Sequence, residues 1–332
     1  MDFVKEMLGK AKSLQKKLVL PEGTEPRTLS AARKIVDQGL SSEVFLLGKE
    51  GEIKDAAAKA GVNLDGISLM DPETSANFDN YANEYYELRK HKGMTPEQAK
   101  IDMKSTLRWG AMMLRLGEVD AFVAGAVSTT ADVLRAGLMI VGTVPGLKTA
   151  SSCFVMQVPD PSFGVDGALI FSDCAVVPNP SAEQLAEIAL SAAQSCREYL
   201  NTDPAVAMLS FSSKGSGGDH EDVKKVLEAL ALVKAKEPSL MVDGEFQADT
   251  ALIPSVRESK APNSSIKGKV NTLVFPDLDA GNIGYKLVQR LAKAEAFGPF
   301  LQGFAKPISD LSRGASVEDI VVTSAVTLAR AR

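Results

Sequence analysis

Short apolar runs alternate with longer amphipathic stretches along the chain, and this alternation constrains the fold more than any other sequence feature. We expect strands at 17–21, 43–47, 120–124, 205–211, 240–243 and 271–275, a mostly helical stretch at 77–116, and helices at 25–38, 131–141, 181–200, 219–236, 280–292 and 316–330. Two further runs, 151–159 and 168–172, flank a connection typical of a hairpin. Strands that alternate with helices are joined by right-handed crossovers and form a mostly parallel sheet. The pattern therefore predicts the α/β class.

Two breaks in this pattern indicate how the chain is divided. The first is the Gly- and Pro-containing segment 142–146, and the second is 297–307. The helix expected at 316–330 is too short to form a domain, so it must pack on something earlier in the chain. We therefore expect one domain to be inserted into another, with the active site in the cleft between them. The expected domains are 1–145 plus 303–332 and 146–302.

The charge balance and the cysteines limit the partners and the compartment. The chain has 332 residues, with 37 Lys and Arg against 42 Asp and Glu, a net charge of −5. A mild negative charge argues against general binding to nucleic acid or to a membrane surface. No run approaches the ~18 consecutive apolar residues of a membrane span, and the N-terminus lacks the apolar core of a secretory signal. The three cysteines, without CxxC or zinc-ligand spacing, fit free thiols in a reducing compartment, so we expect a cytoplasmic protein.

Several common catalytic and nucleotide-binding motifs are missing from the sequence. His91 and His220 both lie in polar surroundings, and no GxSxG motif supplies the nucleophile of a Ser-His-Asp hydrolase. No GxGxxG opens a helix, and no GxxxxGK[ST] occurs. Neither a Rossmann dehydrogenase nor a P-loop kinase is supported.

A run of three hydroxyl residues follows the strand expected at 120–124. Ser128, Thr129 and Thr130 begin a helix, and ligands of parallel sheets bind beyond the carboxyl ends of the strands. One of the three hydroxyls is expected to cap the helix. Capping needs only one hydroxyl, and hydroxyls together with the free N–H groups of a helix start can form an anion-binding site, so the run is open to both interpretations.

Two carboxylates, Asp277 and Asp279, follow the strand expected at 271–275. Carboxylates two residues apart could hold a divalent metal. The alternative is that Asp279 or Asn282 caps the next helix while Asp277 turns the loop. No third carboxylate is close in the sequence, which argues against the metal.

The segment between Ser312 and Asp319 combines a cation, hydroxyls and carboxylates. Ser316 and Asp319 fit the capping pattern [ST]xx[DE], in which the carboxylate reaches back to the cap. Ser312 and Arg313 lie just upstream, where a hydroxyl and a cation would face whatever the helix N-terminus faces. Taken one at a time, three other arginines are more typical of solvated residues: Arg89, Arg135 and Arg290.

Two long motifs are specific enough to indicate a family. They are NTLVFPDLDAGNIGYK at 271–286 and DLSRG at 310–314, the latter followed by Glu318, Asp319 and Ile320. The segments LPEGTE and AGAVSTTADVLR add to them. Together they resemble the phosphate acetyltransferases over essentially the whole chain. The resemblance implies a two-domain α/β/α sandwich with mostly parallel sheets, similar to the isocitrate and isopropylmalate dehydrogenases.

The resemblance also implies an activity and its partners. The implied reaction is the reversible exchange of acetyl-CoA and phosphate with acetyl phosphate and CoA, in acetate metabolism. The implied enzyme is a homodimer that requires no metal and no cofactor beyond coenzyme A as substrate, and both substrates meet in a ternary complex.

By the same resemblance, Ser312, Arg313 and Asp319 are the catalytic residues. Asp319 would act as the base for the CoA thiol, while Arg313 and Ser312 stabilise the charge that develops on the acetyl oxygen and orient phosphate. The residues implied to bind phosphate or CoA are Arg89, Arg135, Arg290, Ser128, Thr129 and Thr130. Cys153 and Cys174 are both candidates for a cysteine that the family carries near its active site.

Two other function classes remain open from the residues alone. A metal-dependent, NAD(P)-linked 2-hydroxy-acid dehydrogenase on the related fold would need magnesium or manganese and would change the absorbance of NAD(P)+. A regulatory protein would bind CoA without turnover.

Overall fold

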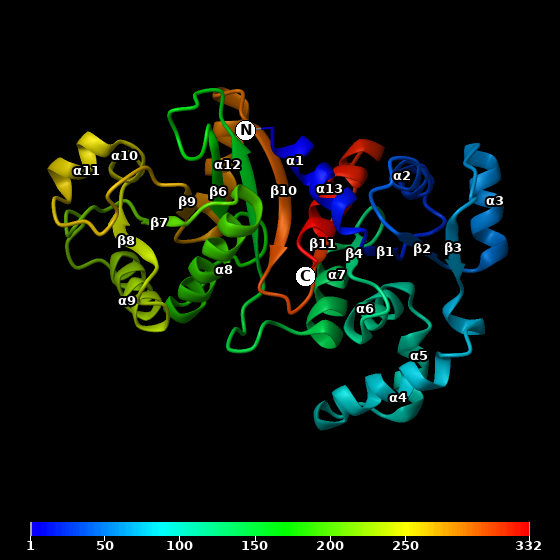
Figure 1. The fold of residues 1–332 in the computed structure, drawn as a ribbon. Helices are drawn as coiled ribbons and strands as arrows, with labels where there is room; N and C mark the ends of the chain where they lie inside the picture. The colour runs from blue at the N-terminus through cyan, green and yellow to red at the C-terminus, as the bar shows by residue number, and fades with distance from the viewer. Residues whose placement is uncertain (1, 332) are drawn as a thin grey trace. The chain divides into compact units, whose positions relative to one another are not determined.

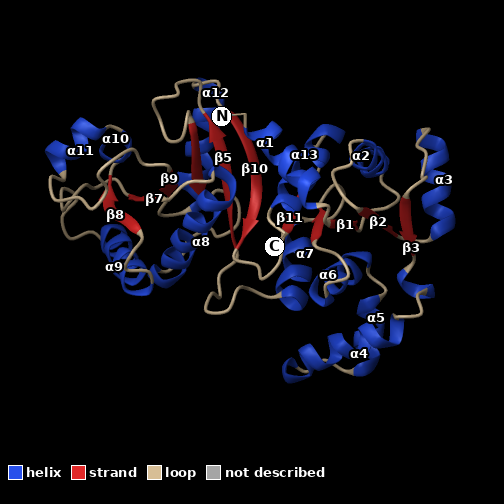
Figure 2. Ribbon diagram, viewed as in Figure 1, coloured by secondary structure: helices blue, strands red, loops and turns tan. Residues whose placement is uncertain are grey.

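The computed structural model describes residues 2–331, which divide into two compact units (Figure 1). One unit is formed by residues 2–144 and 304–331 and is called the terminal unit below. The other is Pro145–Gly303 and is called the middle unit. Each unit is built from strands with helices packed against them, as Figure 2 shows.

The terminal unit is a parallel sheet with the strand order β3-β2-β1-β4-β11. Its strands are β1 (Lys17–Leu20), β2 (Glu43–Leu47), β3 (Ile67–Met70), β4 (Ala121–Ala124) and β11 (Ile308–Asp310). Its helices are α1 (Phe3–Leu14), α2 (Pro26–Asp37), α3 (Glu50–Ala60), α4 (Phe78–Arg89), α5 (Pro96–Met103), α6 (Thr106–Leu116), α7 (Thr130–Ala136) and α13 (Val317–Ala329).

Both faces of this sheet are covered, as expected for parallel strands. Alternate residues of β1, such as Leu18 and Leu20, are fully buried in a core shared with Leu29 of α2 and Ile320 of α13. On the opposite face α6 approaches β4 closely, because a Cβ at Gly110 would lie 3.1 Å from the ring of Phe122. The C-terminal helix thus packs on strands from the beginning of the chain.

The middle unit is a mixed sheet with the strand order β10-β5-β6-β9-β7-β8. Its strands are β5 (Ser151–Gln157), β6 (Ala168–Ser172), β7 (Ala205–Leu209), β8 (Met241–Phe246), β9 (Thr272–Val274) and β10 (Glu295–Gln302). β5 is antiparallel to both β10 and β6, and the pairs beyond β6 are parallel. Its helices are α8 (Ala182–Leu200), α9 (Glu221–Lys236), α10 (Ala248–Leu252), α11 (Pro254–Lys260) and α12 (Leu278–Leu291).

The prediction of an α/β fold with mostly parallel strands is confirmed, including the hairpin of β5 and β6. The strand β10 was not predicted, because Gly298 and Pro299 are typical of a break. In the structure the pairing of β10 with β5 shifts register between Phe297 and Phe300, which accommodates the proline within the strand. The helix expected at 131–141 is an α-helix only to Ala136 and continues as a π turn over Gly137–Val141.

No helix within residues 2–331 is long and apolar enough to cross a membrane.

Candidate active site

Three loops of the terminal unit meet at one edge of its sheet. They follow β1, β4 and β11, which are neighbouring parallel strands, so their carboxyl ends lie together. This edge is where α/β sheets bind ligands. The loops carry Glu22 after β1, residues 125–130 after β4, and residues 311–316 after β11.

The loop after β4 is wrapped around a buried carboxylate. Glu22 Oε2 accepts hydrogen bonds from the N–H groups of Gly125 (3.1 Å) and Ala126 (2.8 Å). Glu22 Oε1 accepts from Val127 (3.1 Å) and Ser128 (2.7 Å). These four amides form an anion site that the protein fills with its own side chain. An external anion at this loop must therefore be held by hydroxyls and cations rather than by these amides.

The hydroxyls at the start of α7 have separate tasks. Thr129 caps the helix, because its Oγ1 accepts from Asp132 N (3.1 Å) and donates to Asp132 Oδ2 (2.7 Å). Thr130 Oγ1 instead donates to Asp310 Oδ2 (2.6 Å). The expectation that one hydroxyl of the three caps the helix is confirmed. Arg135 on the same helix pairs with Asp132 at 2.8 Å, and both side chains are exposed.

Arg313 lies against the loop after β4. Its Nη1 donates to Thr130 Oγ1 (3.2 Å) and to the carbonyl of Ser128 (3.4 Å). Next to it, Ser312 Oγ accepts from Gly314 N (3.2 Å). The structure therefore brings Ser128, Thr130 and Arg313 together, and Arg313 and Ser312 remain exposed.

The carboxylate of Asp310 is buried next to the hydroxyl of Thr130. Asp310 is only 6% exposed, and its Oδ1 is buried with no hydrogen-bond partner in residues 2–331. Burial, reinforced by the negative charge of Glu22, raises the pKa of Asp310 to about 6, against the opposing effects of Thr130 and Arg313.

Arg27 at the start of α2 joins two of the loops. Its Nη1 donates to the carbonyls of Arg313 and Ala315, each at 2.8 Å, and its Nη2 donates to the carbonyl of Ala126 at 3.0 Å. Its Nε pairs with Glu25 at 2.7 Å. Five fixed guanidinium donors suit this cross-link better than a single ammonium would.

Asp319 forms the capping box that the sequence indicates. Its Oδ2 accepts from Ser316 N (2.9 Å) and from Ser316 Oγ (2.8 Å), and its own N–H donates to Ser316 Oγ (3.1 Å). Both bonds to the carboxylate fall on Oδ2, and the residue is exposed at the first turn of α13. The capping role is confirmed, and the geometry leaves Oδ1 outside the capping box.

Two of the other arginines are carried by other elements of the fold, α4 and α12. Arg89 ends α4, is half-buried, and has a buried Nε without a hydrogen-bond partner in the described residues. Arg290 is exposed on α12 in the middle unit. Cys153, Cys174 and Cys196 are buried cysteines of the same unit, and none of the three forms a disulfide. Burial raises the pKa of Cys174 well above its usual range and that of Cys196 to about 11, which disfavours the nucleophilic thiolate.

The paired aspartates after β9 have a structural explanation. Asp277 caps α12 by accepting a hydrogen bond from Ala280 N (2.8 Å), so neither Asp279 nor Asn282 is the cap. The amide of Asn282 donates to the carbonyl of Cys174 (3.0 Å). Residues 2–331 contain no group of three or more His, Cys, Asp and Glu side chains placed to hold a metal ion.

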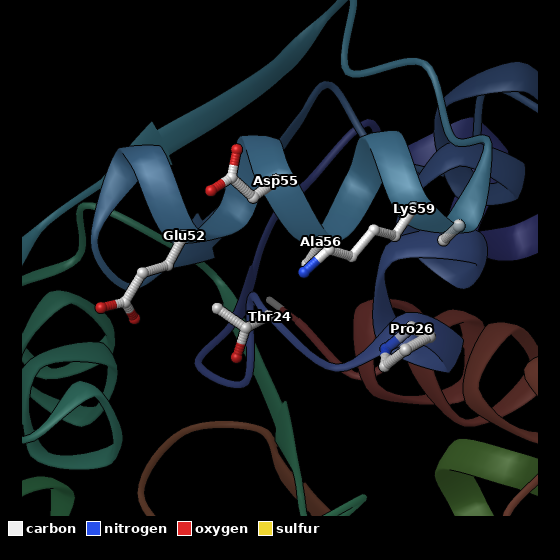
Figure 3. Close-up of a pocket in the computed structure, with 7 residues that line it drawn as sticks. Thr24, Pro26, Glu52, Asp55, Ala56 and Lys59 are labelled. Carbon is white, nitrogen blue, oxygen red and sulfur yellow. The ribbon is translucent and has the colours of Figure 1, made fainter.

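A cavity of about 530 Å³ opens beside the loop that carries Glu22 (Figure 3). It lies between this loop and α3, and Figure 3 shows Thr24 facing the helix that carries Glu52, Asp55 and Lys59. Its rim mixes carboxylates with one ammonium. None of the residues that the sequence indicates for catalysis or binding lines it.

Sequence reasoning missed three residues that organise this edge: Glu22, Arg27 and Asp310. A signal existed for two of them, since Glu22 lies in LPEGTE and Asp310 opens DLSRG. Their partners on the other loops are 99 to 288 positions away in the sequence, so their roles were not visible in local spacing.

Comparison with families of known proteins finds a match to the model described as "Phosphate acetyl/butaryl transferase", over residues 2–328. The chain is similar to the phosphate acetyltransferase of Treponema pallidum, with 56% identity over 330 residues, 99% of this chain and 98% of the relative. It is 49% identical over 332 residues to the phosphate acetyltransferase of Clostridium acetobutylicum, covering 100% of this chain and 99% of the relative.

Solved structures agree with these relatives. The EutD phosphotransacetylase from Staphylococcus aureus superposes with a TM-score of 0.89 at 38% identity and covers 99% of both chains. A structure described as a putative 4-hydroxythreonine-4-phosphate dehydrogenase from Salmonella typhimurium has a TM-score of 0.56 at 13% identity, covering 95% of this chain and 99% of that one. The second likeness is one of fold alone, and it agrees with the dehydrogenase-like fold expected from the sequence.

Proposed function

The chain belongs to the phosphate acetyl/butaryl transferase family and is a phosphate acetyltransferase, and we propose that the loops after β4 and β11 carry its reacting groups. The substrates and products of this class are acetyl-CoA, phosphate, acetyl phosphate and CoA. The observation that supports the proposal best is the position of Arg313, whose guanidinium lies against Thr130 at the carboxyl edge of the sheet.

In this proposal Arg313 binds the phosphoryl group. A guanidinium offers paired donors that match phosphate oxygens, and this one lies against the Thr130 hydroxyl and the Ser128 carbonyl, one position after Ser312 in the chain. Since Glu22 already occupies the amides of residues 125–128, the side chains must supply the donors. Thr129 contributes by holding the start of α7 in place.

Asp319 is the proposed base for the CoA thiol. Its Oδ1 takes the S–H proton while Oδ2 stays in the capping box. The thiolate attacks the carbonyl carbon of acetyl phosphate, and Arg313 and Ser312 stabilise the oxyanion that forms. The bond from that carbon to the phosphate oxygen then breaks, which releases phosphate and leaves acetyl-CoA. In the reverse direction a phosphate oxygen attacks the thioester carbon of acetyl-CoA.

The remaining assignments concern binding and assembly. Arg89, Arg135 and Arg290 would hold phosphate groups of CoA or phosphate itself by charge-assisted hydrogen bonds. We further propose a cytoplasmic homodimer that needs neither metal nor cofactor beyond CoA and binds neither nucleic acid nor membranes. The net charge of −5 and the three buried cysteines, which form no disulfide, support this part of the proposal.

The proposal is tested by following thiol release from acetyl-CoA with and without phosphate. We expect release to require phosphate, to continue in EDTA, and to give intersecting double-reciprocal plots. Replacing Cys153, Cys174 and Cys196 together by Ala should leave turnover in place. Parallel plots with a trapped acetyl-enzyme would replace the ternary complex by a covalent mechanism. Reduction of NAD(P)+ with a 2-hydroxy acid would favour the dehydrogenase instead, and CoA binding without turnover would favour a regulatory protein.

A further inference from the structure

Asp310 is a buried carboxylate that the proposed mechanism does not use. Its Oδ2 has one protein donor, Thr130, and its Oδ1 has no hydrogen-bond partner in residues 2–331. A buried carboxylate with an unsatisfied oxygen is costly to a fold. Some function of the charge must offset this cost.

Hydrogen bonds connect Asp310 to Arg313 through the hydroxyl of Thr130. A threonine hydroxyl has a single proton. Because Arg313 Nη1 donates to Thr130 Oγ1 at 3.2 Å, the Thr130 proton is directed to Asp310 Oδ2 at 2.6 Å. The carboxylate therefore sets the orientation of the hydroxyl, and the hydroxyl presents a lone pair to the guanidinium.

The packing around Asp310 leaves it little freedom to move. A Cβ at Gly125 would lie 2.4 Å from Asp310 Oδ1, and Gly125 has a φ of +113° that other residues rarely adopt. The carboxylate is thus pressed against the same loop that Glu22 holds by four amides. The charged groups that shift the pKa of Asp310 are Glu22 and Arg313. Residues 125–130, which contact both carboxylates, carry no charged side chain.

We propose that Asp310 is a positioning residue for phosphate binding, which holds Arg313 in place through the Thr130 hydroxyl and balances its charge until the phosphoryl group arrives. The proposal rests on the proposed function, because Arg313 is the phosphate ligand there. Asp310 itself does not touch the substrate.

The role of Asp310 has three consequences that a structural role would not have. Since its charge costs folding free energy, the isosteric amide should fold at least as well while positioning Arg313 less firmly. Since Arg313 is assigned to phosphate, the variant should have a lower kcat/KM for acetyl phosphate and a nearly unchanged KM for CoA. A carboxylate that titrates near neutrality should also add an acid limb to the pH profile, which the amide removes.

The test compares the wild-type enzyme with Asp310→Asn, measured with CoA and acetyl phosphate as separately varied substrates. At pH 7.5 we expect kcat/KM for acetyl phosphate to fall about 10- to 100-fold, as small misplacements of a binding group do. We expect KM for CoA to change less than about 2-fold and the thermal midpoint to stay equal or rise.

Three further variants keep the test interpretable. Thr130→Val removes the hydroxyl from a half-buried position and should lower kcat/KM for acetyl phosphate in the same way. The double variant Asp310→Asn with Thr130→Val should be no worse than the stronger single variant, because the two residues act in one chain. Asp120→Asn is the matched control, since Asp120 lies just before β4, at its amino end, and accepts from Lys17 N (2.8 Å).

Several results would overturn the inference. One is a folded Asp310→Asn enzyme whose kcat/KM for acetyl phosphate lies within about 3-fold of wild type. Another is a fall in activity that parallels a fall in thermal midpoint and affects both substrates equally, which would make Asp310 structural. Additive effects in the double variant would exclude the path through Thr130. If the wild-type enzyme released no thiol with phosphate present, the proposed function itself would fail before these comparisons begin.

Discussion

Two buried aspartates at strand ends, one in each unit, differ in how their charge is satisfied. Asp173 follows β6 in the middle unit and is 3% exposed, while Asp310 ends β11 in the terminal unit and is 6% exposed. The carboxylate of Asp173 accepts from both the N–H (3.2 Å) and the hydroxyl of Ser152, and from the N–H groups of residues 175–177 at 2.8–3.3 Å. Asp310 has Thr130 on one oxygen and no partner on the other within residues 2–331.

The difference shows how the surroundings of a buried carboxylate distinguish structure from function. Asp173 organises a turn, and its desolvation is offset by donors on both oxygens. Asp310 keeps an incompletely satisfied charge beside a cation that is itself exposed. Buried groups that are poorly satisfied occur where activity limits stability.

The largest effect we expect concerns Asp319, the exposed carboxylate of the same edge. Asp319→Asn keeps the shape of the side chain but removes its basicity, so kcat should fall by about 10²- to 10⁴-fold. Because the residue also caps α13, stability should change by only about 1 kcal/mol. Initial rates of thiol disappearance with acetyl phosphate, together with a thermal melt, measure both quantities.

The charge-preserving variant Asp319→Glu is the control for this prediction. It can still close the capping box and moves the carboxylate by one bond. An Asp319→Asn enzyme that keeps most of its activity would show that the residue only caps the helix, and the proton acceptor would have to be sought elsewhere.

The next largest effect should be on folding, at Asp173. Asp173→Asn replaces one acceptor oxygen by an NH2 group that faces backbone donors, so the free energy of unfolding should fall by about 3 kcal/mol. Urea denaturation at pH 7.5 measures this loss beside that of Asp310→Asn. Equal stabilities for the two variants would remove the distinction between the two aspartates.

The pH dependence of stability sharpens the same comparison. The pKa of Asp310 is about 6 in the folded chain, above its ordinary value of 3.8, so the folded state binds the proton more tightly. The stabilising contribution of that proton is complete below pH 3.8 and is lost as the pH rises through about 6. The loss amounts to about 3 kcal/mol.

We therefore expect Asp310→Asn to gain stability relative to wild type between pH 4 and 7. Urea midpoints of the two proteins at several pH values measure the difference, in which the other titrating groups cancel. Parallel curves for the two proteins would mean that Asp310 keeps an ordinary affinity for its proton.

The smallest expected effect on stability is at Arg135. Its ion pair with Asp132 is exposed, so Arg135→Gln should change the free energy of unfolding by less than about 0.5 kcal/mol. If Arg135 binds a phosphate group of CoA, KM for CoA should rise about 5- to 10-fold. Lys54→Gln removes a similar exposed pair with Glu50 and should leave KM unchanged. An unchanged KM in Arg135→Gln would remove the residue from the binding site.

The local elements of the fold could be predicted because their signals are short-range. Short apolar runs marked β1, β2 and β4, and the spacing from Ser316 to Asp319 marked the capping box of α13. β11 escaped prediction because two of its three residues, Ser309 and Asp310, are polar, so that Ile308–Asp310 forms no apolar run. A strand of this length is stabilised by its pairing with β4, which no local pattern reports.

In the candidate site too, some features depend on residues close in the sequence and others on residues far apart. By itself the sequence determined the α/β class, the family resemblance and the helix caps, because periodicity, motifs and capping depend on residues a few positions apart. The tertiary structure decided that Glu22 fills the amides of residues 125–128 and that Asp310 lies under Thr130 and Arg313. Asp310 and Thr130 are 180 positions apart, and only the folded sheet, by placing β4 beside β11, brings a carboxylate to a hydroxyl at hydrogen-bonding distance.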